Sequence, residues 1–198
     1  MLLKNTIATK KGKYFKSINK KITFQVALLF APLSYCIHQL EESMGSFRTW
    51  RIRYFPNNNQ LPVEYVFVII TALSLIFIIM FSIRKSKATA QVVLFLFMMT
   101  QVNNALYHPG AGLFFWDYSP GTVTGLLLYL PVNIYIWMKA IEEKWVTKFN
   151  ILFMFVLGAI GFWTFEMGGP IFIVIIFALV ILYLIFSEIK EKYLNKSK

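Results

Sequence analysis

Residues 62–83 are PVEYVFVIITALSLIFIIMFSI, an apolar stretch in which Glu64 is the only charged residue. A helix of about 20 apolar residues matches the hydrocarbon thickness of a lipid bilayer. A helix on the surface of a soluble core is usually shorter and keeps a polar face along its length. This stretch therefore predicts a membrane-spanning helix.

Five more apolar segments of similar length lie along the chain, so we expect an all-α, polytopic membrane helical bundle of six transmembrane helices. The hydrophobic fraction of 58% is more than a soluble domain of 198 residues can bury. Gly168-Gly169-Pro170 predicts a tight break between the last two segments, because proline ends a helical ladder. The five segments are residues 22–44, 88–108, 120–139, 149–166 and 170–188.

The distribution of positive charge predicts the topology. Three arginines lie between the first two segments, whereas the other 17 of the 20 Lys and Arg residues fall on one side of a six-helix chain. Cytoplasmic loops carry an excess of Lys and Arg, so we expect both termini in the cytoplasm (N-in/C-in). The 17 cations lie in two tails and two loops: residues 1–21, 84–87, 139–148 and 190–198.

These features define a basic cytoplasmic N-terminal tail (1–21), a six-helix transmembrane domain (22–188) and a basic cytoplasmic C-terminal tail (189–198). Residues 33–36 (LSYC) place a tyrosine where signal cleavage needs a small residue, so the first helix is expected to be retained. Cys36 is the only cysteine, which excludes an intrachain disulfide.

The net charge of +11 would suggest nucleic acid in a soluble protein, but here it follows the loops and tails. We therefore expect a multi-pass protein of the cell membrane, with membrane lipids as partners and no nucleic acid. A homo-oligomer is compatible with the sequence.

Four separate stretches place polar side chains at the outer ends of the predicted helices, and both histidines of the chain are among them. His38 shares a helical face with Glu41 and Glu42, which follow it by three and four residues. The polar layer consists of His38, Glu41, Glu42, Asn103, Asn104, His108, Asp117, Tyr118 and Glu166.

A second stripe on the third segment comprises Gln101, Asn104 and His108. If the two faces meet, two imidazoles and one or two carboxylates converge, a set that suits a divalent transition metal such as Zn, Fe or Mn, or proton transfer. Ionisable groups near membrane depth tend to be paired and functional. The candidate metal ligands are His38, Glu42 and His108.

Simpler interpretations stay open for each of these residues. Glu41 and Glu42 fit the solvated end of a helix, and His38 fits an interfacial histidine. His108, followed by Pro109-Gly110, fits a C-terminal cap. No complete metal motif such as H-E-x-x-H occurs in the sequence.

His38-Gln39-Leu40-Glu41-Glu42 resembles the H-x-x-E-E signature of the bacterial HXXEE-domain membrane proteins. That family is also recognised by a second histidine, which His108 resembles, and by a Y-x-P-G motif. Tyr118-Ser119-Pro120-Gly121 is similar to this motif, and Tyr107-His108-Pro109-Gly110 also fits it. The family's biochemical role is unassigned, so the resemblance supports the site residues and implies no reaction.

Residues 118–121 also fit a helix entrance. Ser119 suits an N-cap, and Pro120 suits the first turn, where its missing N–H costs nothing. Tyr118 would then lie beside the polar layer, with its hydroxyl near His or Glu, or in the interfacial aromatic belt.

The sequence favours a membrane enzyme that acts on a lipid-soluble or amphipathic small molecule at the outer face. In this hypothesis Glu41 or Glu42 is the general acid or base, and His38 and His108 relay protons or bind metal. The residues expected to orient the substrate are Asn104 and Tyr118. The alternatives are a proton-coupled transporter or ligand-binding membrane protein, and a structural or assembly factor.

Three further features have weaker interpretations. Gly121 and Gly125 fit a small-xxx-small helix contact, and Asn133, after Pro131, fits a hydrogen bond at a kink. The outer arginines would either hold a phosphate-bearing lipid headgroup or pair with Glu41 and Glu42. They are Arg48, Arg51 and Arg53.

Overall fold

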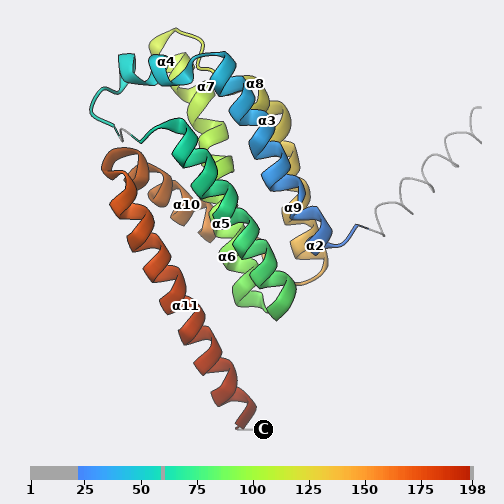
Figure 1. The fold of residues 1–198 in the computed structure, drawn as a ribbon. Coiled ribbons are helices and arrows are strands. Elements are labelled where there is room, and N and C mark those ends of the chain that lie inside the picture. Colours follow the sequence, from blue (N-terminus) through green and yellow to red (C-terminus); the bar gives the residue numbers. More distant parts are fainter. Residues whose placement is uncertain (1–21, 59–60, 197–198) are drawn as a thin grey trace, which may run out of the picture.

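The computed structural model describes residues 22–58 and 61–196, and within these ranges every regular element is helical (Figure 1). The predicted all-α class is therefore confirmed. The N-terminal tail at 1–21 lies outside the described residues. The elements are α2 (Phe24–Ala27), α3 (Phe30–Met44), α4 (Phe47–Tyr54), α5 (Val63–Arg84), α6 (Lys87–Phe97), η1 (Met98–Val102), α7 (Asn103–Phe115), α8 (Thr122–Thr124), η2 (Gly125–Tyr129), α9 (Leu130–Glu142), α10 (Lys148–Gly168) and α11 (Pro170–Lys196).

Five of these helical stretches are long and apolar enough to cross a membrane. They include two composite helices: α6, η1 and α7 run together, as do α8, η2 and α9. The third predicted segment, 88–108, was too short, because the helix continues past Pro109 to Phe115. His108 is therefore inside a helix and is not its C-terminal cap. The five stretches are Val63–Arg84, Lys87–Phe115, Thr122–Glu142, Lys148–Gly168 and Pro170–Leu194.

The first predicted helix, 22–44, is divided into α2 and α3. Pro32 has no N–H to donate to the carbonyl of Leu28, which instead accepts from Ala31 at 3.2 Å. Leu28 and Leu29 still have right-handed helical dihedrals. The chain therefore follows one continuous path along an edge of the bundle (Figure 1).

Local sequence explains where the helices at one end of the bundle begin. Ser86 and Thr147 each cap a helix through a reciprocal capping box, and Lys85 and Lys144 have positive φ in the turns that precede them. At the same end, the N–H of Phe24 donates to Glu143 Oε1 at 2.6 Å. The predicted break between the last two helices occurs at Gly169, whose φ is +68°.

Two π turns, η1 and η2, lie within the composite helices. Gly125, the first residue of η2, lies close to the backbone of Ala105, and a Cβ at this position would lie 3.2 Å from Ala105 Cα, which is a tight contact. Each π turn holds one residue more than an α turn, which rotates the following residues by about 100°. Gln101 consequently leaves the predicted stripe with Asn104 and His108.

Gln101 instead joins a buried structural network. Its amide donates to the carbonyl of Ala31 at 2.9 Å, and its oxygen accepts from Asn133 Nδ2 at 2.9 Å. Asn133 also donates to the carbonyl of Tyr129, four residues earlier, at 2.9 Å. The predicted hydrogen bond of Asn133 beside Pro131 is therefore confirmed, and this network ties three helices together below the polar layer.

Candidate metal centre

Glu42 lies between the two histidines of the chain. Its Oε1 is 3.2 Å from Nε2 of His38 and 3.1 Å from Nε2 of His108. Both imidazoles have 0% exposure and Glu42 has 4%, so the solvated-end interpretation is wrong for Glu42. The structure thus brings together the three residues that the sequence suggested as metal ligands.

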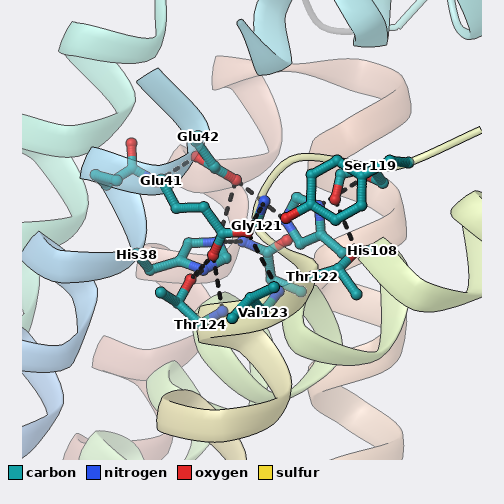
Figure 2. Close-up of polar contacts among 12 residues, drawn as sticks. His38, Glu41, Glu42, His108, Ser119, Gly121, Thr122, Val123 and Thr124 are labelled. Atoms are coloured by element: carbon teal, nitrogen blue, oxygen red, sulfur yellow. Dashed lines mark hydrogen bonds and ion pairs between the residues drawn. The ribbon is translucent and has the colours of Figure 1, made fainter. Parts of the chain in front are cut away.

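Three helices position this cluster. His38 and Glu42 lie one turn apart on the same face of α3, and His108 projects from α7 (Figure 2). Aromatic rings enclose the imidazoles: Tyr129 lies 4.2 Å from the ring of His38, and Phe47 of α4 lies 4.9 Å from that of His108, between centroids. The short helix α4 therefore covers the cluster at the end of the bundle.

Thr124 determines the tautomer of His38. Its hydroxyl donates to Glu41 Oε2 at 2.5 Å and lies 2.7 Å from Nδ1 of His38. A hydroxyl has a single proton, so Thr124 must accept from Nδ1–H. In a neutral imidazole the other nitrogen is then an acceptor, and Nε2 of His38 directs a lone pair toward Glu42 Oε1.

Two acceptors 3.2 Å apart repel each other unless a proton or a metal ion lies between them. Nε2 of His108 also faces Glu42 Oε1, at 3.1 Å, and its Nδ1 lies 3.0 Å from Ser119 Oγ, a hydroxyl that can either donate or accept. Metal-binding histidines are held in this way, with the outer ring nitrogen hydrogen-bonded. A tetrahedral site with bonds of 2.0–2.1 Å separates its ligand atoms by about 3.3 Å, close to the distances here.

Gly121 lies directly against both imidazoles. Its φ is +104°, a conformation that side chains rarely adopt. A Cβ at this position would lie 2.7 Å from His108 Nε2 and 2.8 Å from His38 Cε1. The backbone passes close to the rings only because this residue is glycine, so the expected helix-contact role of Gly121 is replaced by contact with the cluster.

Glu41 has a different environment from Glu42 (Figure 2). Its Oε1 accepts hydrogen bonds from the Tyr118 hydroxyl at 2.5 Å and from the N–H groups of Gly121 and Val123 at 3.0 and 3.2 Å. Its Oε2 accepts from the N–H and the hydroxyl of Thr124, at 2.7 and 2.5 Å. Glu41 thus holds the start of α8 against α3, an arrangement that we call the carboxylate clamp.

The carboxylate clamp changes the predicted helix entrance. The helix begins at Thr122 with Gly121 as its cap, while Ser119 bonds His108 and Pro120 precedes the helix. The predicted N-cap role of Ser119 and first-turn role of Pro120 are therefore wrong. The N–H groups at the start of α8 find their acceptor in Glu41, which is far away in the sequence.

Tyr118 contributes to the clamp from an exposed position. Burial of its hydroxyl, together with the hydrogen bond to Glu41, raises the pKa of Tyr118 to about 12, so the hydroxyl remains a donor at neutral pH. Its expected position beside the polar layer is thus realised through Glu41. Its predicted role in orienting substrate stays a prediction.

The geometry distinguishes the two Y-x-P-G stretches. Residues 118–121 supply Tyr118 to Glu41, Ser119 to His108 and Gly121 to both rings. At the other copy, a Cβ on Gly110 would have no described atom within 4 Å. The family described as "Protein of unknown function with HXXEE motif" matches residues 29–136. The chain belongs to the HXXEE family.

The HXXEE match covers the clamp and all three members of the cluster. The fixed positions of the motif are His38, Glu41 and Glu42, and each makes the polar contacts described above. No curated protein and no solved structure matches the chain. The three fixed positions of the HXXEE motif thus correspond to the residues that form the cluster and the clamp.

A cavity of about 70 Å³ is lined in part by Glu42. Asn104, whose Nδ2 lies 3.4 Å from His38 Nε2, and Gln39, which donates to Glu42 Oε2 at 2.5 Å, also line it. Asn104 is therefore placed where the sequence analysis expected a substrate-orienting residue. That role stays a prediction.

One interpretation of the sequence expected the outer arginines to pair with Glu41 and Glu42. Among the described residues, Arg51 and Arg53 pair with other acids. Arg51 lies 2.8 Å from Glu166, and Arg53 lies 3.7 Å from Asp117. Both acidic partners belong to the predicted polar layer. This layer consequently has two parts, the His–Glu–His cluster and a set of ion pairs around α4.

Sequence reasoning did not identify Thr124, Gln39 or the contact between Ser119 and His108. Thr124 and Ser119 lie beside or within the second Y-x-P-G stretch, and this proximity was the only available signal. Gln39 lies within the HXXEE motif, at one of its variable positions.

Proposed function

We propose that this protein is a membrane-embedded, metal-dependent enzyme with its active centre at His38, Glu42 and His108. The observation that carries the proposal is the convergence of two imidazole Nε2 atoms on one carboxylate oxygen, with each Nδ1 facing a hydroxyl. Three protein ligands leave a fourth position open, which is the arrangement of catalytic rather than structural zinc sites.

A membrane location with six spans agrees with the dimensions of the helices. Together α2 and α3 extend from Phe24 to Met44, about 31 Å at 1.5 Å per residue, which suffices for a sixth span. The cations of the α5–α6 and α9–α10 connections lie at the end of the bundle opposite the cluster, whereas Arg48, Arg51 and Arg53 of α4 lie at the cluster end. The N-in/C-in topology then places the active centre near the outer face.

The chemistry that suits this centre is hydrolysis of a lipid-soluble or amphipathic substrate. A divalent metal with an open position makes bound water a nucleophile near neutral pH and polarises a carbonyl. In this proposal Glu42, His38 and His108 hold the metal, and Asn104 orients the substrate from the cavity wall. Glu41 is assigned to the clamp, because both of its oxygens already accept hydrogen bonds.

Metal content provides the direct test. The full-length protein, purified in detergent without chelators, is expected to contain about one equivalent of Zn, Fe or Mn by elemental analysis, and His108→Ala is expected to contain much less. Glu64→Gln, an exposed carboxylate at the start of α5, is the control. Wild-type protein that takes up none of these metals, even after incubation with each, contradicts the proposal.

Activity is tested separately, by incubating the metal-loaded protein with ester and amide lipids and analysing the products by mass spectrometry. We expect turnover that chelation abolishes and that re-addition of the metal restores. Metal-binding protein that turns over none of these lipids would contradict the enzymatic part of the proposal. If His108→Ala lowered only thermal stability, the cluster would be structural.

Proton-coupled transport is the second candidate, favoured by a continuous polar chain. Hydrogen-bond contacts link Glu41, Thr124, His38, Glu42 and His108 in sequence. Such chains relay protons in transporters. Proton flux into liposomes that depends on Glu42 and persists after chelation would favour this function over the enzyme.

A further inference from the structure

The proposed active centre has no room for a substrate. Both imidazoles have 0% exposure, and Glu42 has 4%. The cavity that Glu42 lines measures about 70 Å³, enough for a few water molecules, whereas sites for small organic ligands usually measure about 300–1,000 Å³. A substrate can therefore reach Glu42 only if part of the cavity wall moves.

Helix α4 is the part of this wall that can move most easily. Phe47 and Arg51 of α4 line the cavity, and the ring of Phe47 lies 4.9 Å from that of His108, between centroids. The other lining residues belong to α3, α5, α10, α11 and the composite helix of α6, η1 and α7, which run along the bundle (Figure 1). With 8 residues, α4 is only about 12 Å long and lies at the end of the bundle. It can therefore be displaced without shifting the long helices.

The connection between α3 and α4 has the properties of a hinge. Only Gly45 and Ser46 separate the two helices. Ser46 has φ +57° and ψ 42°, in the left-handed region that residues other than glycine adopt less often. Hinges are short connections whose few residues absorb a change in φ and ψ. A change of backbone conformation at Ser46 would swing the last turn of α4 away from the cluster.

Polar contacts hold the last turn of α4 in place. Nη2 of Arg51 lies 2.8 Å from Oε2 of Glu166 on α10, and the two side chains are only 11% and 12% exposed. The hydroxyl of Tyr54 donates to Asp117 Oδ2 at 2.9 Å, and Nη1 of Arg53 lies 3.7 Å from the same oxygen. Exposed ion pairs contribute little to stability, whereas removing one partner of a buried pair is costly. Of these contacts, the ion pair between Arg51 and Glu166 therefore restrains α4 most.

We propose that α4 is a lid that swings about Gly45 and Ser46 to admit substrate to Glu42, and that the ion pair between Arg51 and Glu166 is its latch. The inference rests on the proposed function, because a lid implies a substrate, but the opening itself requires no metal ion. It assigns access to α4 and leaves the metal ligands on α3 and α7.

Chemical modification of the two histidines of the chain reports the opening, because both lie under the lid. Metal-free, full-length protein in detergent is treated with diethyl pyrocarbonate, which acylates imidazole nitrogen. The rates at His38 and His108 are followed by mass spectrometry, well below the melting temperature. Glu166→Gln and Arg51→Met are each expected to react about tenfold faster than wild type, which corresponds to about 1.4 kcal/mol in favour of the open state. Glu188→Gln is the matched control, because it removes the carboxylate of an arginine–glutamate pair at the opposite end of the bundle, and it should react like wild type.

A reversible cross-link separates opening of the lid from general unfolding. Arg53→Cys and Asp117→Cys, in a Cys36→Ser background, place two thiols where the charged atoms of the natural pair lie 3.7 Å apart, and a short bis-methanethiosulfonate reagent joins them. The joined protein should react with diethyl pyrocarbonate roughly tenfold more slowly than the same protein after reduction, because α4 can no longer swing. Adding Glu166→Gln should speed the reaction only in the reduced protein.

The outcomes test the lid, the latch and the metal centre separately. Equal rates before and after reduction of the cross-link overturn the lid, because the imidazoles are then reached by another route. Wild-type rates in both Glu166→Gln and Arg51→Met overturn the latch. Histidines that react only when α4 is free, in a protein that takes up no Zn, Fe or Mn, support the lid and contradict the metal centre.

Discussion

Glu41 and Glu42 are neighbours in the sequence but belong to two different regions of the molecule. Glu41 faces the start of α8, where it accepts five hydrogen bonds, and Glu42 faces the imidazoles of His38 and His108. Successive residues on a helix point about 100° apart, so one turn of α3 serves both regions. The clamp and the cluster are mechanically coupled through Gly121 and Thr124, which contact both regions.

The coupling has a direction. The clamp fixes the backbone at Gly121, which contacts both rings, and orients the hydroxyl of Thr124, which bonds His38. Damage to the clamp should therefore reach the cluster, whereas loss of a cluster ligand should leave the clamp intact.

Replacing Glu42 should have the largest effect on metal binding. Glu42→Gln removes the only carboxylate of the cluster, and since outer hydrogen-bond partners alone affect metal affinity 10–100-fold, we expect a loss greater than about 100-fold. Competitive titration with a chromophoric chelator measures it. Glu41→Gln is the neighbouring comparison and should lose less affinity but more thermal stability. The opposite order would show that the two glutamates have been assigned the wrong way round.

Gly121→Ala should damage both regions at once. The new Cβ meets both imidazoles at less than 3 Å, and positive φ costs a non-glycine residue about 1–2 kcal/mol. We expect a lower melting temperature in detergent together with a loss of metal. Gly110→Ala, inside α7 in the first Y-x-P-G stretch, is the matched control and should lower neither the melting temperature nor the metal content. Equal effects at both glycines would contradict the assignment of residues 118–121 as the motif of the site.

The extent to which this site follows from the sequence depends on the range of each interaction. The meeting of His38, Glu42 and His108 was predictable, because helical spacing and the charge of the loops place these residues at one depth. The clamp was not, because Glu41 caps a helix that lies 80 residues further along the chain. The predicted position of Gln101 on the stripe with Asn104 and His108 was wrong, because no sequence pattern near it indicates a π turn. The π turn depends on how closely two helices pack.

The same distinction holds for the fold. Five apolar stretches long enough to cross a membrane follow from composition alone. The division of α2 from α3 follows from Pro32, which the sequence displayed but whose effect on the helix we did not anticipate. The partner of Arg51 could not be inferred, since Glu166 reaches it only through the packing of α10 against α7.

Thr124→Val should weaken metal binding without removing a ligand. The substitution keeps the shape of the side chain but eliminates the acceptor of His38 Nδ1–H, so affinity should fall about 10–100-fold. The N–H of Thr124 still donates to Glu41, which should preserve most of the clamp. Thr71→Val, a similar change on α5, is the control. An unchanged affinity would mean that the tautomer of His38 is not set by Thr124.

The smallest expected effect concerns the clamp alone. Tyr118→Phe removes one of five donors to Glu41 at an exposed position, so we expect a loss of about 0.5 kcal/mol in stability and no change in metal affinity. Folding raises the pKa of Tyr118 from 10.0 to about 12. The stability that its hydroxyl contributes is therefore present below pH 10 and lost as pH rises through 12. Wild type and Tyr118→Phe should therefore differ in melting temperature at pH 8 and converge at strongly alkaline pH. A difference that persisted there would place the contribution of Tyr118 in ring packing and not in its hydroxyl.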